Sequence, residues 1–142
     1  MISQLKSIKR ILVTGGAGFI GGNLIRRLLL DTDAQIFNLD KMGYASDLTG
    51  IDKTLKQIKA DLPIRHTLIK ADLYNYDQTQ EALKISNPDF VIHLAAESHV
   101  DRSIDDPSSF LQSNIIGTYN LLKAVHAHWS NLSTSRKKLF RF

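Results

Sequence analysis

Thr14-Gly15-Gly16-Ala17-Gly18-Phe19-Ile20-Gly21 is the stretch that decides the fold of this chain. It follows the apolar residues 11–13 and precedes an apolar-periodic segment, so it is predicted to be the turn between a first strand and a first helix. The glycines at 15, 18 and 21 allow a tight turn, close approach of a pyrophosphate, and close packing of helix on strand. The N-terminus of the helix adds unpaired N–H groups and partial positive charge. The pattern predicts a nucleotide site, with a plain glycine turn as the alternative.

Composition bounds the class of protein. The chain has 142 residues, of which 43% are hydrophobic and 23% charged, which is typical of a single globular domain. The absence of cysteine excludes disulfides, thiolate zinc sites and a cysteine nucleophile, and the scattered histidines predict no metal site. No leader-like or membrane-length apolar run occurs, so a cytoplasmic protein without membrane contact is expected.

The net charge of +4 raises the question of a nucleic-acid partner. The basic residues are dispersed, except for Arg136-Lys137-Lys138 with Arg141 near the C-terminus. This cluster is interpreted as a solvated or disordered tail, so no nucleic-acid partner is predicted.

Strand-like and helix-like patterns alternate along the chain, which predicts a Rossmann-type α/β fold. Strands are expected near residues 10–14, 34–40, 66–71 and 90–94, and helices near 18–30, 78–85 and from 107 onward. Residues 41–62 are ambiguous between loop and helix. The expected sheet is parallel with strand order 3-2-1-4, helices on both faces, and residues 139–142 as the stub of a fifth strand.

Local patterns predict details of packing and capping. The fourth strand is expected to be buried on both faces because it is continuously apolar. Asp77 and Asp106 are predicted helix N-caps, the latter with Pro107 in the first helical position. The apolar side chains expected on the inner faces of the first and last helices are Phe19, Leu24, Ile25, Leu28 and Leu29, and Leu111, Ile115, Leu122, Val125 and Trp129.

Acidic residues close two of the predicted strands. Asp40 lies about 20 residues after the last glycine of the motif, where a carboxylate binds an adenosine ribose and repels a 2′-phosphate, which favours NAD over NADP. Lys41 softens that preference. Asp72 ends the third strand and could reach the adenine edge. In both cases the alternative is that the acid merely ends a strand.

A polar sequence, His93-Leu94-Ala95-Ala96-Glu97-Ser98-His99-Val100-Asp101-Arg102-Ser103, follows the fourth strand. Ligands of open α/β sheets bind beyond the carboxyl ends of strands, where the strand order reverses. Ala95 and Ala96 are small enough for a dinucleotide to lie against the backbone. The alternative is a surface loop with an Asp101–Arg102 ion pair.

These segments resemble the extended short-chain dehydrogenase/reductase family, most closely its dTDP-glucose 4,6-dehydratase group. The matching residues are 14–21, 39–41, 71–73, 93–104, and Asn114 with Gly117-Thr118. The resemblance implies NAD as cofactor, a dTDP-sugar substrate, and a homo-oligomer. The implied cofactor contacts are Gly15, Gly18, Phe19, Ile20, Gly21, Asp40, Lys41, Met42, Gly43, Asp72, Leu73, Leu94, Ala95, Ala96, Glu97, Ser98 and Ser113. Ser98 is also implied to contact the sugar.

The sequence departs from the family pattern in a few places. Met42-Gly43 stands where Leu-Thr is usual, Ser113 where Thr is usual, and Asn23 near a position that is commonly small. The first departure bears on the ribose contacts.

The family's catalytic motifs bear on activity. The resemblance implies a lyase that converts dTDP-glucose to dTDP-4-keto-6-deoxyglucose with transient hydride transfer to NAD, using a Tyr-x-x-x-Lys pair and a Thr-Asp-Glu motif. Thr-Asp-Glu does not occur in this chain. Tyr119 and Lys123 have the pair's spacing but precede its place in the family, so Tyr119 is interpreted as a packing residue and Lys123 as solvated.

No catalytic residue is therefore assigned. The chain is expected to be the truncated, NAD-binding N-terminal portion of such an enzyme, without the sugar-nucleotide domain and inactive alone. It is also expected to self-associate through an exposed sheet edge. The alternatives are a portion of another nucleotide-sugar epimerase or dehydratase, a non-catalytic NAD-binding or regulatory module, and a vestigial product.

Overall fold

The computed structural model describes residues 8–58, 64–99, 104 and 106–142. Four strands form one sheet in the order β3-β2-β1-β4. The pairs β1–β2, β1–β4 and β2–β3 are all parallel, which confirms the predicted topology. The strands are β1 (Arg10–Thr14), β2 (Gln35–Asp40), β3 (His66–Lys70) and β4 (Phe90–His93).

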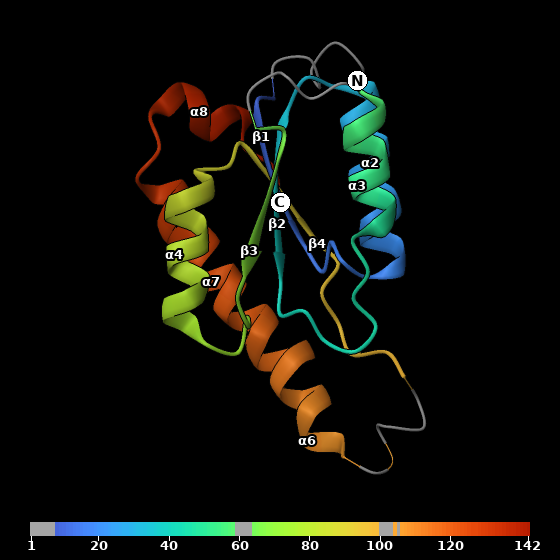
Figure 1. Cartoon of the computed structure of the whole chain (residues 1–142). Helices are drawn as coiled ribbons and strands as arrows, with labels where there is room; N and C mark the ends of the chain where they lie inside the picture. The colour runs from blue at the N-terminus through green and yellow to red at the C-terminus, as the bar shows by residue number, and fades with distance from the viewer. Residues whose placement is uncertain (1–7, 59–63, 100–103, 105) are drawn as a thin grey trace.

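Helices cover both faces of this sheet, as predicted. Figure 1 shows α2 and α3 on one side of the strands and α4 and α7 on the other. The ambiguous segment contains a helix, α3, preceded by a loop. The helical elements are α2 (Phe19–Asp31), α3 (Thr49–Gln57), α4 (Tyr76–Ser86), α6 (Pro107–Phe110), the π-helical segment η1 (Leu111–Ile116), α7 (Gly117–Ser130) and α8 (Thr134–Leu139).

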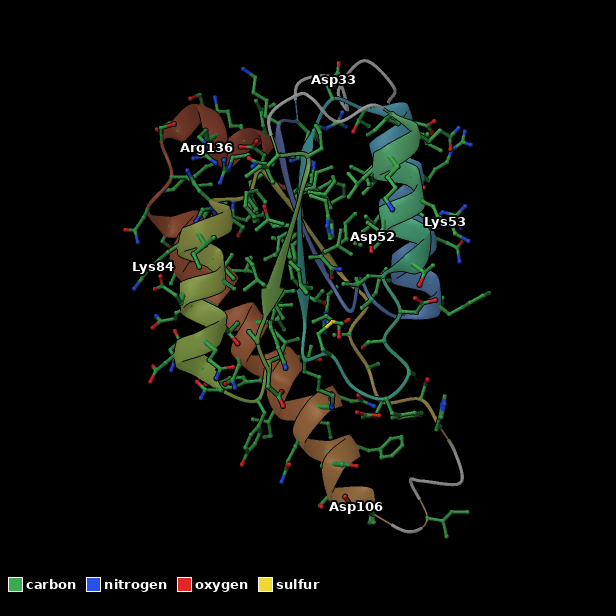
Figure 2. All side chains as sticks on the ribbon, viewed as in Figure 1. Asp33, Asp52, Lys53, Lys84, Asp106 and Arg136 are labelled. Carbon is green, nitrogen blue, oxygen red and sulfur yellow. The ribbon has the colours of Figure 1, made fainter. Side chains whose placement is uncertain are left out.

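The central strand β1 contributes side chains to two hydrophobic cores, because successive side chains point to opposite faces of the sheet. Ile11 and Val13 enter the core beneath α2 and α3, and Leu12 enters the core beneath α4 and α7. Figure 2 shows side chains filling both layers, while Lys53 and Lys84 point outward from α3 and α4. The first core also contains Ile25, Leu29, Ala34, Ile36 and Ile51, and the second Phe37, Leu39, Ala71, Leu73, Ala82, Leu83, Val91, Leu121, Ala124 and Val125.

The inner face of α2 differs from the prediction at one position. Ile25 and Leu29 are buried, and Leu24 and Leu28 are partly buried against the same core. Phe19, however, is 88% exposed, so its predicted burial is wrong. It occupies the first position of α2, at the end of the sheet, where no strand lies beneath it to cover the ring.

The predicted apolar stripe of the last helix is also largely wrong. Leu111, Ile115, Leu122 and Trp129 are exposed, and only Val125 of that set is buried. The π-helical turn of η1 changes the helical phase, because its hydrogen bonds span one more residue than those of an α-helix. The face of α7 that packs on the domain instead consists of Gly117, Asn120, Leu121, Ala124 and Val125.

Two capping predictions have different outcomes. Asp106 caps α6 by accepting a hydrogen bond from the Ser108 N–H, with Pro107 in the first turn, as predicted. The cap of α4 is Asn75 and not Asp77. The Asn75 side-chain oxygen accepts from the Gln78 N–H at 3.1 Å, so α4 begins one residue before the predicted cap.

Three predictions about the fourth strand and the C-terminus need correction. The predicted burial of β4 on both faces holds only in part, because Val91 is buried in one core whereas Phe90 and Ile92 are only partly buried against the other. Among the described residues, the outer edge of β4 forms only a parallel bridge between Phe90 and Arg141. That bridge is all that forms of the predicted fifth strand, since Leu139 belongs to α8. The basic cluster at 136–138 is likewise part of α8 and is not a disordered tail.

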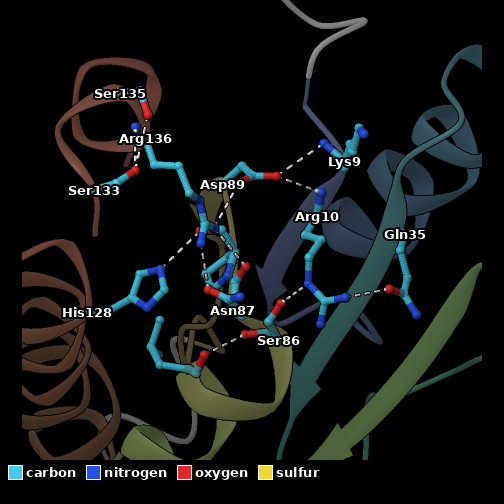
Figure 3. Close-up of polar contacts among 12 residues, drawn as sticks. Lys9, Arg10, Gln35, Ser86, Asn87, Asp89, His128, Ser133, Ser135 and Arg136 are labelled. Atoms are coloured by element: carbon cyan, nitrogen blue, oxygen red, sulfur yellow. Dashed lines mark hydrogen bonds and ion pairs between the residues drawn. The ribbon is translucent and has the colours of Figure 1, made fainter. Parts of the chain in front are cut away.

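Polar contacts tie α8 to the end of the sheet where the strands begin (Figure 3). Asp89 lies at the centre: its Oδ2 accepts from the Lys9 and Arg10 N–H groups, each at 3.2 Å, and its Oδ1 accepts from Arg136 at 2.9 Å. Arg136 also donates to the Asn87 side chain and to the Asn87 and Pro88 carbonyls. The turn before β4 therefore joins β1, β4 and α8.

We expect Asp89→Ala to lower the free energy of unfolding by about 1–3 kcal/mol, because it removes the acceptor of the partly buried Arg10 N–H, of the exposed Lys9 N–H and of a guanidinium. Urea unfolding followed by circular dichroism measures the change. Glu81→Ala is the matched control: its ion pair with Lys84 is exposed, so a loss below about 0.5 kcal/mol is expected. Equal losses in the two variants would contradict the role of Asp89.

Candidate functional site

A cleft opens at the carboxyl ends of the strands, at the point where the strand order reverses between β1 and β4. Figure 1 shows the connections that leave β2 and β4 meeting at this end of the sheet. Of the predicted cofactor contacts, those that line the cleft are Gly15, Gly18, Asp40, Lys41, Gly43, Asp72, Leu73, Leu94, Ala95, Ala96, Glu97, Ser98 and Ser113. The structure therefore brings together residues from five separate segments of the chain.

Several lining residues were not predicted from the sequence. They are Leu39, Tyr44, Ala45, Ser46, Ala71 and His99. Tyr44, Ala45 and Ser46 lie in the loop of the ambiguous segment, where glycine and serine signalled a turn but nothing indicated its direction. His99 stands in the polar sequence after β4. The remainder of that sequence, residues 100–103, lies outside the described residues.

Gly15 brings the backbone of the turn against the loop that follows β4. It adopts the left-handed conformation, with φ of 69°, and its N–H donates to the Leu39 carbonyl at 2.8 Å. A Cβ at this position would lie 2.6 Å from the Ala95 nitrogen. At Gly21 a Cβ would collide with the Gly15 carbonyl oxygen. Both positions therefore require glycine, as the motif predicts.

The N-terminus of α2 faces this turn without a side-chain cap. Gly18 is its N-cap residue, and within α2, which is described in full, the first turn carries no acidic residue. The first amides and the positive end of the helix dipole are thus left for an anion. Gly21 is buried beneath the turn, whereas the Phe19 and Ile20 side chains are exposed and do not line the cleft.

Asp40 joins the glycine turn to the loop after β2. Its side chain is largely buried, and Oδ2 accepts from the Ala17 N–H at 3.0 Å. Oδ1 accepts from the Met42 N–H at 2.8 Å and from the Ser46 hydroxyl at 3.1 Å. Asp40 thus does more than end a strand, because it holds two walls of the cleft together. Met42 has a φ of 59° and does not line the cleft; its N–H bonds to Asp40.

Asp72 forms a similar local turn after β3. Its Oδ1 accepts from the Tyr74 N–H at 2.9 Å, and its own N–H donates to the Gln78 side chain at 3.0 Å. The adjacent Leu73 is buried and packs against Gly117 at the start of α7. These contacts place Asp72 and Leu73 at the side of the cleft beyond β3.

His93 links β1 to α7 beneath the loop after β4. Its Nδ1 lies 2.7 Å from the Thr14 hydroxyl, and its Nε2 lies 3.0 Å from the Thr118 hydroxyl. The Thr118 hydroxyl donates to the Asn114 carbonyl at 2.7 Å, so it accepts from His93 Nε2–H. Nδ1 is then the acceptor for Thr14, which describes a neutral imidazole. Burial lowers the pKa of His93, in agreement with a neutral ring.

Two side chains from β1 and η1 hold the loop after β4. The Thr14 hydroxyl accepts from the Leu94 and Ala95 N–H groups at 3.2 and 3.3 Å. The Asn114 amide pairs with both backbone groups of Glu97, accepting from its N–H at 2.8 Å and donating to its carbonyl at 2.9 Å. This reciprocal pair of hydrogen bonds gives a structural role to Asn114, one of the residues on which the family resemblance rests.

Two contacts cross between the loops that follow β2 and β4. Lys41 Nζ lies 2.5 Å from Glu97 Oε1. The Tyr44 and His99 rings meet edge to face, with centroids 5.2 Å apart. All of these residues line the cleft.

Tyr119 and Lys123 lie away from the cleft lining. Tyr119 is 60% exposed, so its interpretation as a packing residue is wrong. Lys123 is exposed, as expected, and its ammonium lies 4.4 Å from the centroid of the Tyr76 ring on α4. Within the described ranges, no acidic or histidine cluster could hold a metal ion, and no helix there is long and apolar enough to cross a membrane.

The chain is similar to known nucleotide-sugar enzymes. Residues 12–142 match the family model for GDP-mannose 4,6 dehydratase. The chain is 43% identical over 132 residues to a probable dTDP-glucose 4,6-dehydratase of Sinorhizobium fredii, and 42% identical over 135 residues to the dTDP-glucose 4,6-dehydratase of Shigella flexneri. These alignments cover 93% and 94% of this chain but 36% and 35% of the relatives. The chain therefore spans about a third of their length.

Solved structures show the same likeness. A dTDP-glucose 4,6-dehydratase from Streptomyces venezuelae with NAD bound has a TM-score of 0.70 and 33% identity, covering 84% of this chain and 36% of that one. A UDP-glucose 4-epimerase from Thermus thermophilus in complex with NAD has a TM-score of 0.68 and 28% identity, covering 84% and 34%.

Three partly buried histidines predict a pH dependence of stability. Burial lowers the pKa of His66, His93 and His128, so at mildly acidic pH the unfolded chain binds more protons than the folded one. We expect the free energy of unfolding to fall as the pH is lowered below about 6.5, and His93→Gln to reduce that slope. Urea unfolding between about pH 5 and 8 measures the slope, and parallel curves for wild type and variant would contradict the assignment.

Proposed function

Because the chain belongs to the GDP-mannose 4,6 dehydratase family, we propose that it is the NAD-binding part of a dTDP-glucose 4,6-dehydratase. The observation that carries the proposal is the cleft itself. It joins the Gly15 turn, the uncapped N-terminus of α2 and the loop of Ala95 and Ala96 at the switch point of a parallel sheet. Such a site fits a dinucleotide lying across the sheet.

Different groups of lining residues would contact different parts of the proposed NAD ligand. The glycine turn and the first amides of α2, including those of Phe19 and Ile20, would hold the pyrophosphate. Residues 40–43 would surround the adenosine ribose, with Asp72 and Leu73 beside the adenine. Residues 94–98 and Ser113 would line the nicotinamide half, and Ser98 would also reach the sugar. When bound, NAD would accept a hydride from the sugar and later return it.

The fit of these residues to a dinucleotide rests on the space that they leave. Glycine at positions 15 and 21 lets the turn pack closely against Ala95 and against α2, and the small Ala95 and Ala96 keep the floor of the cleft open. Hydrogen bonds from Ala17, Met42 and Ser46 fix the Asp40 carboxylate in place. It is therefore a preorganised hydrogen-bond acceptor for a ligand.

The proposal also covers the substrate, oligomeric state and cellular location of the whole enzyme. The named relatives support a dTDP-sugar substrate, and the reaction class is a lyase that works through NAD. We propose a cytoplasmic homo-oligomer that needs neither nucleic acid nor membrane. In support of association, the outer edge of β4 meets only the Arg141 bridge among the described residues.

A UDP-glucose 4-epimerase is the second candidate. It is favoured by the fold likeness to the enzyme of Thermus thermophilus. We prefer the dehydratase because the two curated relatives described above, 43% and 42% identical to the chain, are a probable and a named dTDP-glucose 4,6-dehydratase. A non-catalytic NAD-binding module is the remaining alternative.

We expect the purified chain to bind NAD with a dissociation constant on the order of micromolar, as measured by isothermal titration calorimetry. Ala96→Leu should weaken binding at least about tenfold, because the added side chain occupies the floor of the cleft, where Ala96 is exposed.

The control for Ala96→Leu is Ser135→Leu, which introduces the same side chain on the exposed surface of α8 (Figure 3), at a residue that does not line the cleft. It should leave NAD affinity unchanged. Folded wild-type protein without NAD binding would refute the proposal, and equal affinity of Ala96→Leu and wild type would refute the location.

We also expect the 142-residue chain alone not to convert dTDP-glucose, because Thr-Asp-Glu does not occur in it and Tyr119 and Lys123 lie outside the cleft. Incubation with NAD and dTDP-glucose followed by chromatography of the sugar nucleotides tests this, with a full-length relative as positive control. Formation of the 4-keto-6-deoxy product by the chain would overturn the assignment of no catalytic residue.

A further inference from the structure

The cleft is poor in cations. Among the described residues that line it, Lys41 is the sole lysine or arginine, whereas Asp40, Asp72 and Glu97 are acidic. An anionic ligand would thus meet a mostly negative wall, apart from the amides of the glycine turn. The state of Lys41 therefore decides how much extra negative charge the cleft accepts.

Lys41 stands where a cation matters for cofactor choice. It follows Asp40 directly, at the end of β2, the position beside the ribose of a bound adenosine in such folds. A free cation there would attract a 2′-phosphate, which carries about −1.5 to −2 charges near neutral pH. From the sequence alone, Lys41 therefore weakens the preference for NAD that Asp40 provides.

In the structure Lys41 is not free. Its Nζ lies 2.5 Å from Glu97 Oε1, and the Glu97 side chain is only 20% exposed. Glu97 comes from the loop after β4, far from Lys41 in sequence, so the pair forms only in the folded chain.

The backbone of Glu97 is fixed independently of the ion pair. The Asn114 amide binds both its N–H and its carbonyl, and Thr118 in turn holds the Asn114 carbonyl. Glu97 therefore presents its carboxylate toward Lys41 with little freedom to move away. A preorganised partner competes with a phosphate better than a mobile one does.

We propose that Glu97 is a specificity-determining residue: by occupying Lys41, it keeps the cleft selective for NAD over NADP. The inference rests on the proposed dinucleotide site. With Lys41 neutralised, a 2′-phosphate meets the Asp40 and Glu97 carboxylates without a compensating cation. The Asp40 carboxylate repels the 2′-phosphate, and Glu97 neutralises the Lys41 ammonium that would otherwise attract it.

Glu97→Gln tests the proposal because it frees Lys41 while keeping the size and the backbone clamp of residue 97. Calorimetric titration with NAD and with NADP measures the ratio of the two dissociation constants. We expect the variant to shift this ratio toward NADP by at least about fivefold, and added salt to reduce the shift. The double variant Lys41→Gln/Glu97→Gln should return the ratio to near the wild-type value.

Matched controls separate this role from general effects. Glu81→Gln removes a carboxylate from an exposed ion pair on α4 and should leave both affinities unchanged. Glu97→Ala is the second variant that frees Lys41, and circular dichroism checks that each variant is folded.

The outcomes are distinct. Equal weakening of NAD and NADP by Glu97→Gln would show that the ion pair only clasps the two loops, and it would overturn the proposal. An unchanged ratio in both Glu97 variants would do the same. Folded wild-type protein that binds neither nucleotide would instead overturn the proposed dinucleotide site, and the specificity role with it.

Discussion

The contact between the backbone of Gly15 and the loop after β4 is the constraint on which the rest of this structure depends. Gly15 takes a left-handed conformation and leaves no room for a Cβ beside Ala95. Its N–H also binds the carbonyl of Leu39 in β2. One residue thus sets the end of β1 against both of its neighbours. Because the strand order reverses here, the same contact also shapes the floor of the cleft.

Several polar side chains around the cleft form hydrogen bonds within the protein that hold the walls of the cleft in place. Asp40 joins the glycine turn to the loop after β2, and Thr14, His93 and Asn114 hold the loop after β4. Buried polar groups are stable only when they are hydrogen-bonded, and these groups satisfy one another or the backbone. The walls of the cleft are thereby set in advance, which lowers the ordering cost of binding.

A polar network and the candidate cleft lie at opposite ends of the sheet. The strands begin at a polar network in which Asp89 binds the start of β1 and Arg136 of α8, while Arg10 donates to the last carbonyls of α4 (Figure 3). The strands end at the cleft. Loops at the carboxyl ends of strands can then vary with the ligand while the other end holds the layers together.

The four strands and their order follow from the sequence alone, whereas α3 lies in a segment that was ambiguous between loop and helix and α8 in one that was predicted to be a tail. Alternating apolar runs and the Gly15–Gly18–Gly21 spacing are local signals, so the strands, most helices and the glycine turn could be predicted from neighbouring residues. Errors arose where distant contacts decide the outcome. Phe19 is exposed at the first position of α2, and η1 changes the helical phase between Leu111 and Ile115 on one side and the buried face of α7 on the other.

The hydrogen-bond and ion-pair partners of the polar side chains in the cleft become apparent only in the folded structure. Sequence position predicts a ribose beside Asp40 and Lys41. It gives no sign that Ala17, Met42 and Ser46 share the Asp40 carboxylate, or that Glu97 pairs with the Lys41 ammonium. These partners come together through parallel pairing of strands that are far apart along the chain. Charge and hydrogen bonding act through space, so no local pattern in the sequence records them.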